Sequence, residues 1–143
     1  MEARLLPPVM PAPAYKPDGY SSVSVYLLAD EPQRVLDFLA DVVGAEPLRR
    51  FDLPDGRLEH AEVRIDDTVL MIAEAGAGFP AFPVWLHVYV PDVDETYRRA
   101  IEAGGTSVQP PMQKGDADRR CGVRGPAGNT WWFSTQIDDP DES

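Results

Sequence analysis

The chain has 143 residues, of which 43% are hydrophobic and 26% charged, as in one ordinary globular domain. A net charge of −11 leaves too little positive charge for unspecific binding to nucleic acid or an anionic membrane, so we expect neither partner. The single cysteine, Cys121, excludes an intrachain disulfide and a cysteine-rich zinc site. There is no apolar run of the ~20 residues that a membrane span needs. The N-terminal residues also lack the pattern of a secretory signal, so we expect a cytoplasmic protein.

The first half of the chain predicts a strand, a helix and three further strands. Residues 1–18 contain five prolines and are expected to form an extended arm. Residues 22–27 alternate, which predicts a strand with Val23, Val25 and Leu27 on one face and Ser22, Ser24 and Tyr26 on the other. An amphipathic helix is predicted from about Pro32 to Gly44. Strands follow at 47–53, 58–65 and 68–73, and a connection rich in glycine and proline covers 75–83.

The second half repeats this order. Residues 84–90 alternate, so one face carries aliphatic residues and the other carries Trp85, His87 and Tyr89. A helix is predicted over 93–103, with Asp94 as its N-cap and Gly104-Gly105 at its end. Strands are predicted at 107–109, 120–124 and 130–136, with a polar loop at 110–118 and an acidic tail at 138–143.

The repeat predicts an α+β domain over residues 19–137, built from two βαβββ modules, module one at 19–75 and module two at 83–137. A single module of this kind covers only one face of its sheet. Pairing two modules therefore stabilises both, and we expect it to leave a cleft lined by the uncovered faces.

Several segments, in this order and spacing, resemble the vicinal oxygen chelate superfamily, which comprises the glyoxalase, bleomycin-resistance and extradiol-dioxygenase proteins. The segments are Val90-Pro91-Asp92-Val93-Asp94 and Gly125-Pro126-Ala127-Gly128-Asn129-Thr130-Trp131-Trp132. Five further segments resemble the PhnB-like branch of the superfamily: Gly56-Arg57, His60–Ile65, Val69-Leu70-Met71, Pro110-Pro111 and Asp118–Val123. The resemblance covers residues 19–137 and implies a homodimer. It does not specify one reaction, since this fold hosts many chemistries.

In metal-dependent members of the superfamily, ligands come from the first and last strands of each module. The resemblance carries those positions over to Ser24, Met71, Trp85 and Trp132. A hydroxyl, a thioether and two indoles are not the usual ligands of a divalent cation. We therefore expect no metal cofactor at the inherited position.

The leading functional interpretation is a metal-independent protein that binds a small planar or hydrophobic molecule. Aromatic walls suit such ligands. The expected walls are Tyr26, Trp85, Tyr89 and Trp132, with His87, Ser24 and Arg120 orienting polar groups. Trp131 and Trp132 point to opposite faces of one strand, so we place Trp132 in the cleft and Trp131 against a helix.

Two other interpretations stay open. His60, Glu62 and His87 are all predicted on uncovered faces and are the alternative ligands of a divalent metal in a lyase, isomerase or dioxygenase-type enzyme. His87 is also the candidate general base, because an imidazole titrates near neutral pH. In the third interpretation, a dimer without a ligand, the tryptophans fill the cleft themselves.

Overall fold

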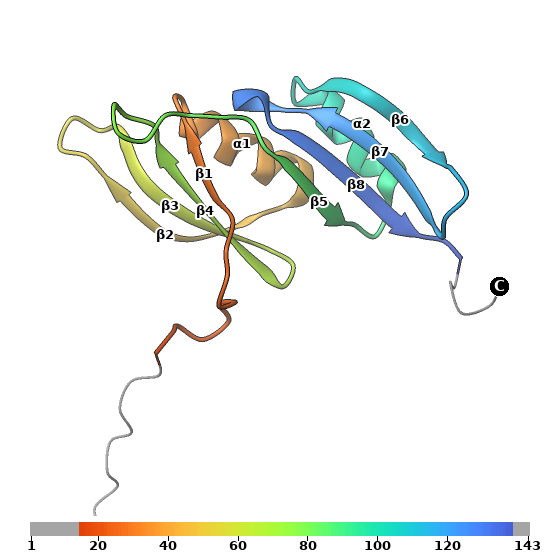
Figure 1. Ribbon diagram of the computed structural model, residues 1–143, viewed down its shortest axis with the longest axis horizontal. Helices are drawn as coiled ribbons and strands as arrows, with labels where there is room; N and C mark the ends of the chain where they lie inside the picture. Colours follow the sequence, from red (N-terminus) through yellow and green to blue (C-terminus); the bar gives the residue numbers. More distant parts are fainter. Residues whose placement is uncertain (1–14, 139–143) are drawn as a thin grey trace, which may run out of the picture.

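The computed structural model describes residues 15–138 and places two four-stranded sheets and two α-helices there (Figure 1). Module one comprises β1 (Tyr26–Ala29), α1 (Pro32–Val43), β2 (Glu46–Asp52), β3 (Leu58–Ile65) and β4 (Thr68–Glu74). Module two comprises β5 (Trp85–Tyr89), α2 (Val93–Glu102), β6 (Thr106–Gln113), β7 (Asp118–Arg124), the short 3₁₀ turn η1 (Pro126–Gly128) and β8 (Thr130–Gln136). Most of the predicted arm, 1–18, and nearly all of the acidic tail, 138–143, lie outside the described residues.

Both sheets have the same topology. The strand order is β1-β4-β3-β2 in the first sheet and β5-β8-β7-β6 in the second. In each sheet the first strand runs parallel to the last, and the other neighbours are antiparallel. This arrangement confirms the predicted α+β class and the repeated βαβββ module.

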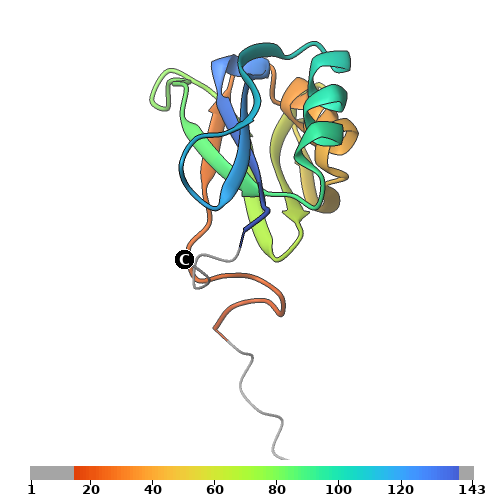
Figure 2. The same ribbon diagram turned by 90° about the vertical axis from the view of Figure 1, so that its right-hand side faces the viewer.

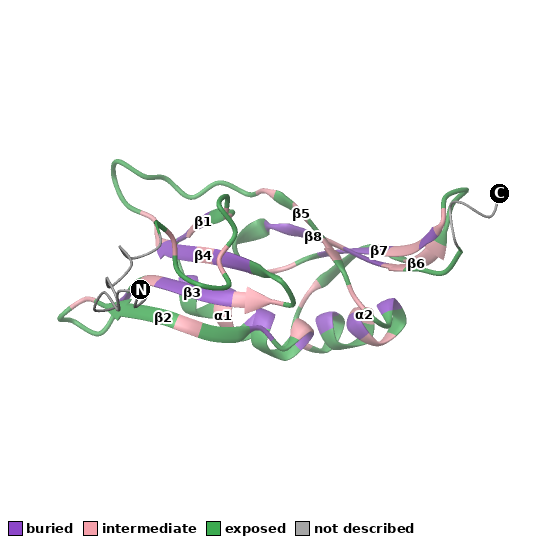
Figure 3. Cartoon of the chain, turned by 90° about the horizontal axis from the view of Figure 1, so that it is seen from below, coloured by how far each residue is buried: buried purple, intermediate pink, exposed green. Residues whose placement is uncertain are grey.

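The two helices lie on the same side of the molecule, each against the sheet of its own module (Figure 2). Helix α1 also reaches module two, since the Phe38 ring centroid lies 6.3 Å from that of Trp131 on β8. Figure 3 shows buried residues on the strands of both sheets and on both helices. Trp131 is 1% exposed, which confirms its predicted position against a helix.

The shared helical layer leaves each sheet with one covered face and one open face. A cavity of about 460 Å³ lies between the modules, and its lining includes Val25, Thr68 and Leu70 of module one and Trp85, His87 and Tyr89 of β5. Helix α1 packs against both modules and holds the two sheets side by side.

Three predicted boundaries were wrong. Strand β1 begins at Tyr26 rather than at 22, so Val23 is left 83% exposed. The N-cap of α2 is Asp92, whose Oδ1 accepts from the backbone N–H of Glu95 at 3.1 Å. Asp94 instead forms an ion pair with Arg119 at 2.8 Å. Strand β6 continues to Gln113, through the Pro110-Pro111 segment that was expected to be a loop.

Candidate functional site

The open face of module two, called here the module-two face, carries the predicted aromatic side chains of β5. Strand alternation turns Leu86 and Val88 toward the core and leaves Trp85, His87 and Tyr89 exposed on the other face. Trp85 is 76% exposed, a large apolar area for one copy of the chain to leave in contact with water.

An aromatic corner lies at the centre of this face. The indole rings of Trp85 and Trp132 meet edge to face, with centroids 5.3 Å apart and an interplanar angle of 61°. Gly122 on β7 allows this arrangement, because a Cβ atom there would lie 2.5 Å from Cζ3 and 2.8 Å from Cε3 of Trp132. The missing side chain therefore provides the space in which the Trp132 ring lies.

A chain of hydrogen bonds runs along the face beside the aromatic corner. The buried Ser134 hydroxyl is 2.9 Å from His87 Nε2 and accepts from Arg120 Nε at 2.9 Å. Arg120 Nη2 donates to Asp118 Oδ2 at 3.1 Å, and the Tyr89 hydroxyl donates to the same oxygen at 2.8 Å. These bonds link side chains from β5, β7 and β8 and hold them in one geometry.

The surroundings of His87 favour its neutral form. Desolvation of the partly covered ring lowers the pKa of His87, and the positive charge of Arg120 lowers it further, while Asp118 opposes them. The Ser134 hydroxyl can donate to or accept from His87 Nε2, so either tautomer of the neutral ring satisfies this bond. In both tautomers Ser134 engages Nε2, and Nδ1 is the ring nitrogen that lies outside this bond.

The aromatic corner and the hydrogen-bonded side chains beside it line one end of a cavity of about 300 Å³. This volume is at the lower end of the range for small-molecule sites. Its lining consists of Trp85, His87, Gln109, Met112, Lys114, Arg120 and Trp132. The sequence reasoning placed Trp85, His87, Arg120 and Trp132 in the site but missed the β6 side chains and Lys114. Two register shifts in the β6–β7 pairing remove the period of two that would have marked β6 as a strand.

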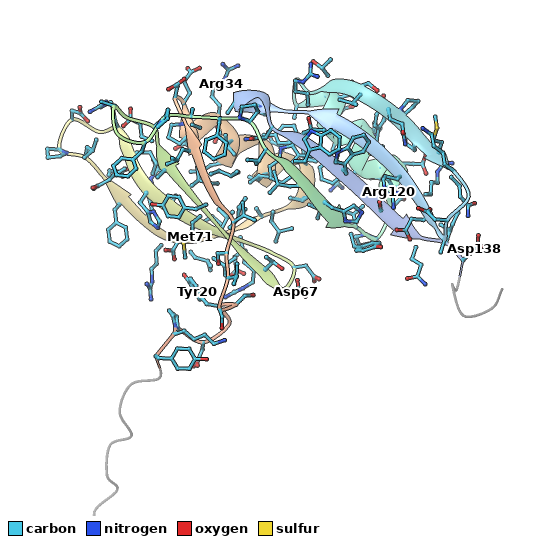
Figure 4. The ribbon with its side chains drawn as sticks, in the orientation of Figure 1. Tyr20, Arg34, Asp67, Met71, Arg120 and Asp138 are labelled. Atoms are coloured by element: carbon cyan, nitrogen blue, oxygen red, sulfur yellow. The ribbon has the colours of Figure 1, made fainter. Side chains whose placement is uncertain are left out.

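The remaining candidate residues lie in module one. Tyr26 and Met71 are paired neighbours on β1 and β4, and His60 and Glu62 lie on β3. Figure 4 places Met71 and Arg120 in different sheets. Ser24 precedes β1, in the segment that leads into module one, so it lies outside the strand on which it was predicted.

The alternative metal ligands are not assembled within one chain. His60 Nε2 lies 2.9 Å from Glu62 Oε2, so the two side chains use these atoms on each other, while His87 belongs to the other sheet. Among residues 15–138, no three His, Cys, Asp or Glu side chains are grouped so that they could hold a metal ion. Within one chain His60, Glu62 and His87 therefore do not form the proposed three-ligand site.

Comparison with known proteins identifies the family. Residues 22–133 match the model of the Glyoxalase/Bleomycin resistance protein/Dioxygenase superfamily. The chain belongs to this superfamily. An uncharacterised protein of Mycobacterium tuberculosis, Rv0887c, is 30% identical over 121 residues, which cover 77% of this chain and 71% of that protein.

Solved structures share the fold. TioX from Micromonospora sp. ML1 superimposes with a TM-score of 0.71 at 29% sequence identity, over 81% of this chain and 98% of TioX. TnmS3, an antibiotic binding protein from Streptomyces sp. CB03234, superimposes with a TM-score of 0.61 at 21% identity, over 81% of this chain and 97% of TnmS3. In the part of the chain that the structure describes, neither helix has the length and apolar character needed to cross a membrane.

Proposed function

We propose that this superfamily member is a metal-independent protein that binds a small planar or hydrophobic molecule on the module-two face. The observation that carries the proposal is the Trp85–Trp132 corner, an edge-to-face indole pair beside a cavity of about 300 Å³. Flat apolar ligands bind well against such walls because aromatic surfaces bury a large area in a fixed geometry.

The polar groups of the face support binding rather than catalysis. The Ser134 hydroxyl bonds both His87 and Arg120, and the Arg120 guanidinium pairs with Asp116 and Asp118. Side chains that satisfy one another in this way are rigid before a ligand arrives, so little ordering is needed on binding.

The superfamily includes both binding proteins and enzymes, so the fold alone does not select the function. TnmS3 illustrates an antibiotic binding protein with this fold. The choice between the two classes rests on the side chains. Within one chain His60, Glu62 and His87 are divided between two sheets, so the enzyme alternative needs a second copy to bring them around one cation, and metal analysis decides between the two classes.

We also propose that the protein is a homodimer. Aromatic residues on both open faces remain half or more exposed: Tyr26 51%, Phe51 54%, Tyr89 61% and Trp85 76%. A second copy that placed the open face of its module one opposite the module-two face of the first would cover these side chains and close two equivalent clefts.

We also propose that the protein belongs to the PhnB-like branch, which rests on the sequence motifs, and that it is cytoplasmic, which rests on the composition.

A fluorescence titration tests the binding proposal. The chain has three tryptophans, and Trp131 is buried away from the module-two face. Planar aromatic compounds should therefore change the emission of Trp85 and Trp132, and Trp132→Leu should weaken binding. Phe79→Ala is the matched control, because Phe79 is 70% exposed in the connection between the modules.

Analytical ultracentrifugation tests the proposed homodimer. It should show two chains per particle.

Metal analysis and thermal melts with and without a chelator test the rival enzyme. Indifference to the chelator is the expected result. Stoichiometric metal, together with a melting temperature that falls on chelation and recovers with one cation, would refute the metal-independent binder.

A further inference from the structure

Two permanent cations, Arg120 and Lys114, line the cavity of the module-two face, and they differ in how their charge is balanced. The Arg120 guanidinium pairs with the carboxylates of Asp116 and Asp118, at 3.2 and 3.1 Å. Within residues 15–138 Lys114 forms no such ion pair, and its Nζ donates to the neutral amide oxygen of Gln109 at 2.9 Å. An ammonium group has three N–H donors, so Lys114 can offer both its charge and further donors to a ligand.

Gln109 fixes the position of this ammonium group. Its Nε2 donates to the backbone oxygen of Arg120 at 3.1 Å, so the other amide atom, Oε1, faces Lys114 as an acceptor. Gln109 lies on β6 and Lys114 in the connection between β6 and β7, so the lysine side chain folds back along the strand. The bond holds a side chain that would otherwise rotate freely, and it does so before a ligand arrives.

The strand register places the ammonium group beside the aromatic corner. Gln109 is paired with Gly122 on β7, and Gly122 is paired with Trp132 on β8. The Trp132 ring lies over Gly122, which brings the ring toward Gln109 on the next strand, about 4.8 Å further across the sheet. A flat ligand stacked on Trp132 therefore has its edge directed toward the Lys114 end of the cavity.

The charges of the site favour a ligand with one negative charge. Lys114 supplies one positive charge, and the carboxylates of Asp116 and Asp118 stand beside Arg120, where they would repel a dianion such as a phosphate ester. The net charge of −11 also gives the protein no general attraction for anions. Recognition of an anion here therefore depends on the local contact with Lys114, in which a charge-assisted hydrogen bond is stronger than a neutral one.

We propose that Lys114 determines the specificity of this site and that the ligand is a planar aromatic carboxylate. The ring lies against Trp85 and Trp132, and the carboxylate accepts from Lys114 Nζ. This inference rests on the proposed function, because it names the class of the planar molecule that the same cavity binds. In the proposed dimer the cavity is the floor of a cleft, and the connection that carries Lys114 lies at the end of module two away from module one (Figure 1).

Two probes of the same shape separate the effect of charge from that of aromatic contact. 2-Naphthoate carries a carboxylate at neutral pH, and 2-naphthamide has a neutral group of similar size in its place. Isothermal titration calorimetry gives the Kd of each probe, and the preference is the ratio of the 2-naphthamide Kd to the 2-naphthoate Kd. For the wild-type protein we expect a preference of about 5–10-fold, as for one charge-assisted bond at a partly exposed site.

Substitutions at the two lysines of the chain identify the source of the preference. Lys114→Met removes the charge and keeps the length of the side chain, so it should abolish the preference, whereas Lys114→Arg keeps the charge and should retain it. Lys16→Met is the matched control, because it changes the net charge by the same amount in the segment before β1, where Lys16 donates to Ser22. Its preference should equal that of the wild type.

The results distinguish this inference from the proposed function on which it rests. Equal binding of the two probes by wild-type protein, or a preference that Lys114→Met retains, would overturn the role of Lys114 and leave the binder of planar molecules standing. Binding of neither probe would overturn both. Salt supplies a second readout, because dissolved ions screen an exposed charge. The preference should shrink as the salt concentration rises, and a preference that is independent of salt would contradict a contact between charges.

Discussion

Replacing Gly122 with alanine is the sharpest test of the aromatic corner. The new Cβ atom would lie 2.5, 2.8 and 3.0 Å from three atoms of the Trp132 ring, all closer than normal van der Waals contact. The ring is rigid and wedged against Trp85, so it cannot yield by rotating a flexible end. Trp132 or the backbone of β7 must move instead.

The size of the effect follows from overpacking. Inserting one methyl group into a tightly packed site costs about 1–3 kcal/mol, which for a domain of this size lowers Tm by roughly 3–10 °C. Part of the edge-to-face contact with Trp85 is lost as well, and such pairs contribute about 0.5–1.5 kcal/mol. Binding of a planar ligand to the corner should weaken roughly 2–10-fold by the same amount of free energy.

Thermal unfolding and the circular dichroism of the coupled indoles measure both consequences. Gly122→Ala should lower Tm and reduce the signal that arises from the Trp85–Trp132 pair. Gly78→Ala is the matched control, because a Cβ atom at Gly78 meets nothing within 4 Å. If Gly122→Ala kept both the wild-type Tm and the indole signal, the Trp132 ring would not lie over Gly122 and the described corner would be wrong.

Three further predictions concern single side chains of the folded chain. Because the pKa of His87 is lowered in the folded chain, the unfolded chain binds this proton first as the pH falls, so stability declines between about pH 7 and pH 5. Melts at both pH values should show a smaller decline for His87→Gln, and parallel curves would contradict the assignment. Asn129→Ala should cost about 1–3 kcal/mol in urea unfolding, because it leaves the backbone N–H of Val84 without its 2.9 Å acceptor. The exposed Gln136→Ala should change stability by less than about 0.5 kcal/mol, and equal losses would count against the role of Asn129. Burial raises the pKa of the Cys121 thiol to about 11, so a thiol reagent should modify one cysteine per chain only after unfolding. Rapid reaction of the native protein would contradict this burial.

Local patterns in the sequence determined the repeated modules and the faces of β5. A strand places alternate side chains on opposite faces whatever surrounds it, so Trp85, His87 and Tyr89 were assigned together correctly. The same geometry separated Trp131 from Trp132. Helix α1 was also recognisable, since its proline at the start and Gly44 at its end are local signals.

Tertiary contacts decided the features that the sequence reasoning missed. Helix α2 begins at Val93, so Asp92 stands at the N-cap, while Asp94 lies in the first turn and pairs with Arg119 of β7. Strand β1 pairs with β4 only over Tyr26–Ala29, and the bulges of β6 hide the alternation of that strand. None of these contacts is visible in the spacing of residues along one segment.

For the candidate site too, some features follow from the sequence and others only from the tertiary structure. The sequence determined which residue types stand on the open faces, because alternation depends only on the backbone of each strand. Only the tertiary structure joined Tyr26, His60, Glu62 and Tyr20 into one hydrogen-bonded chain, since they come from two strands and the segment before β1. Only the tertiary structure separated His87 from His60, because α1 packs against both modules and holds the two sheets side by side.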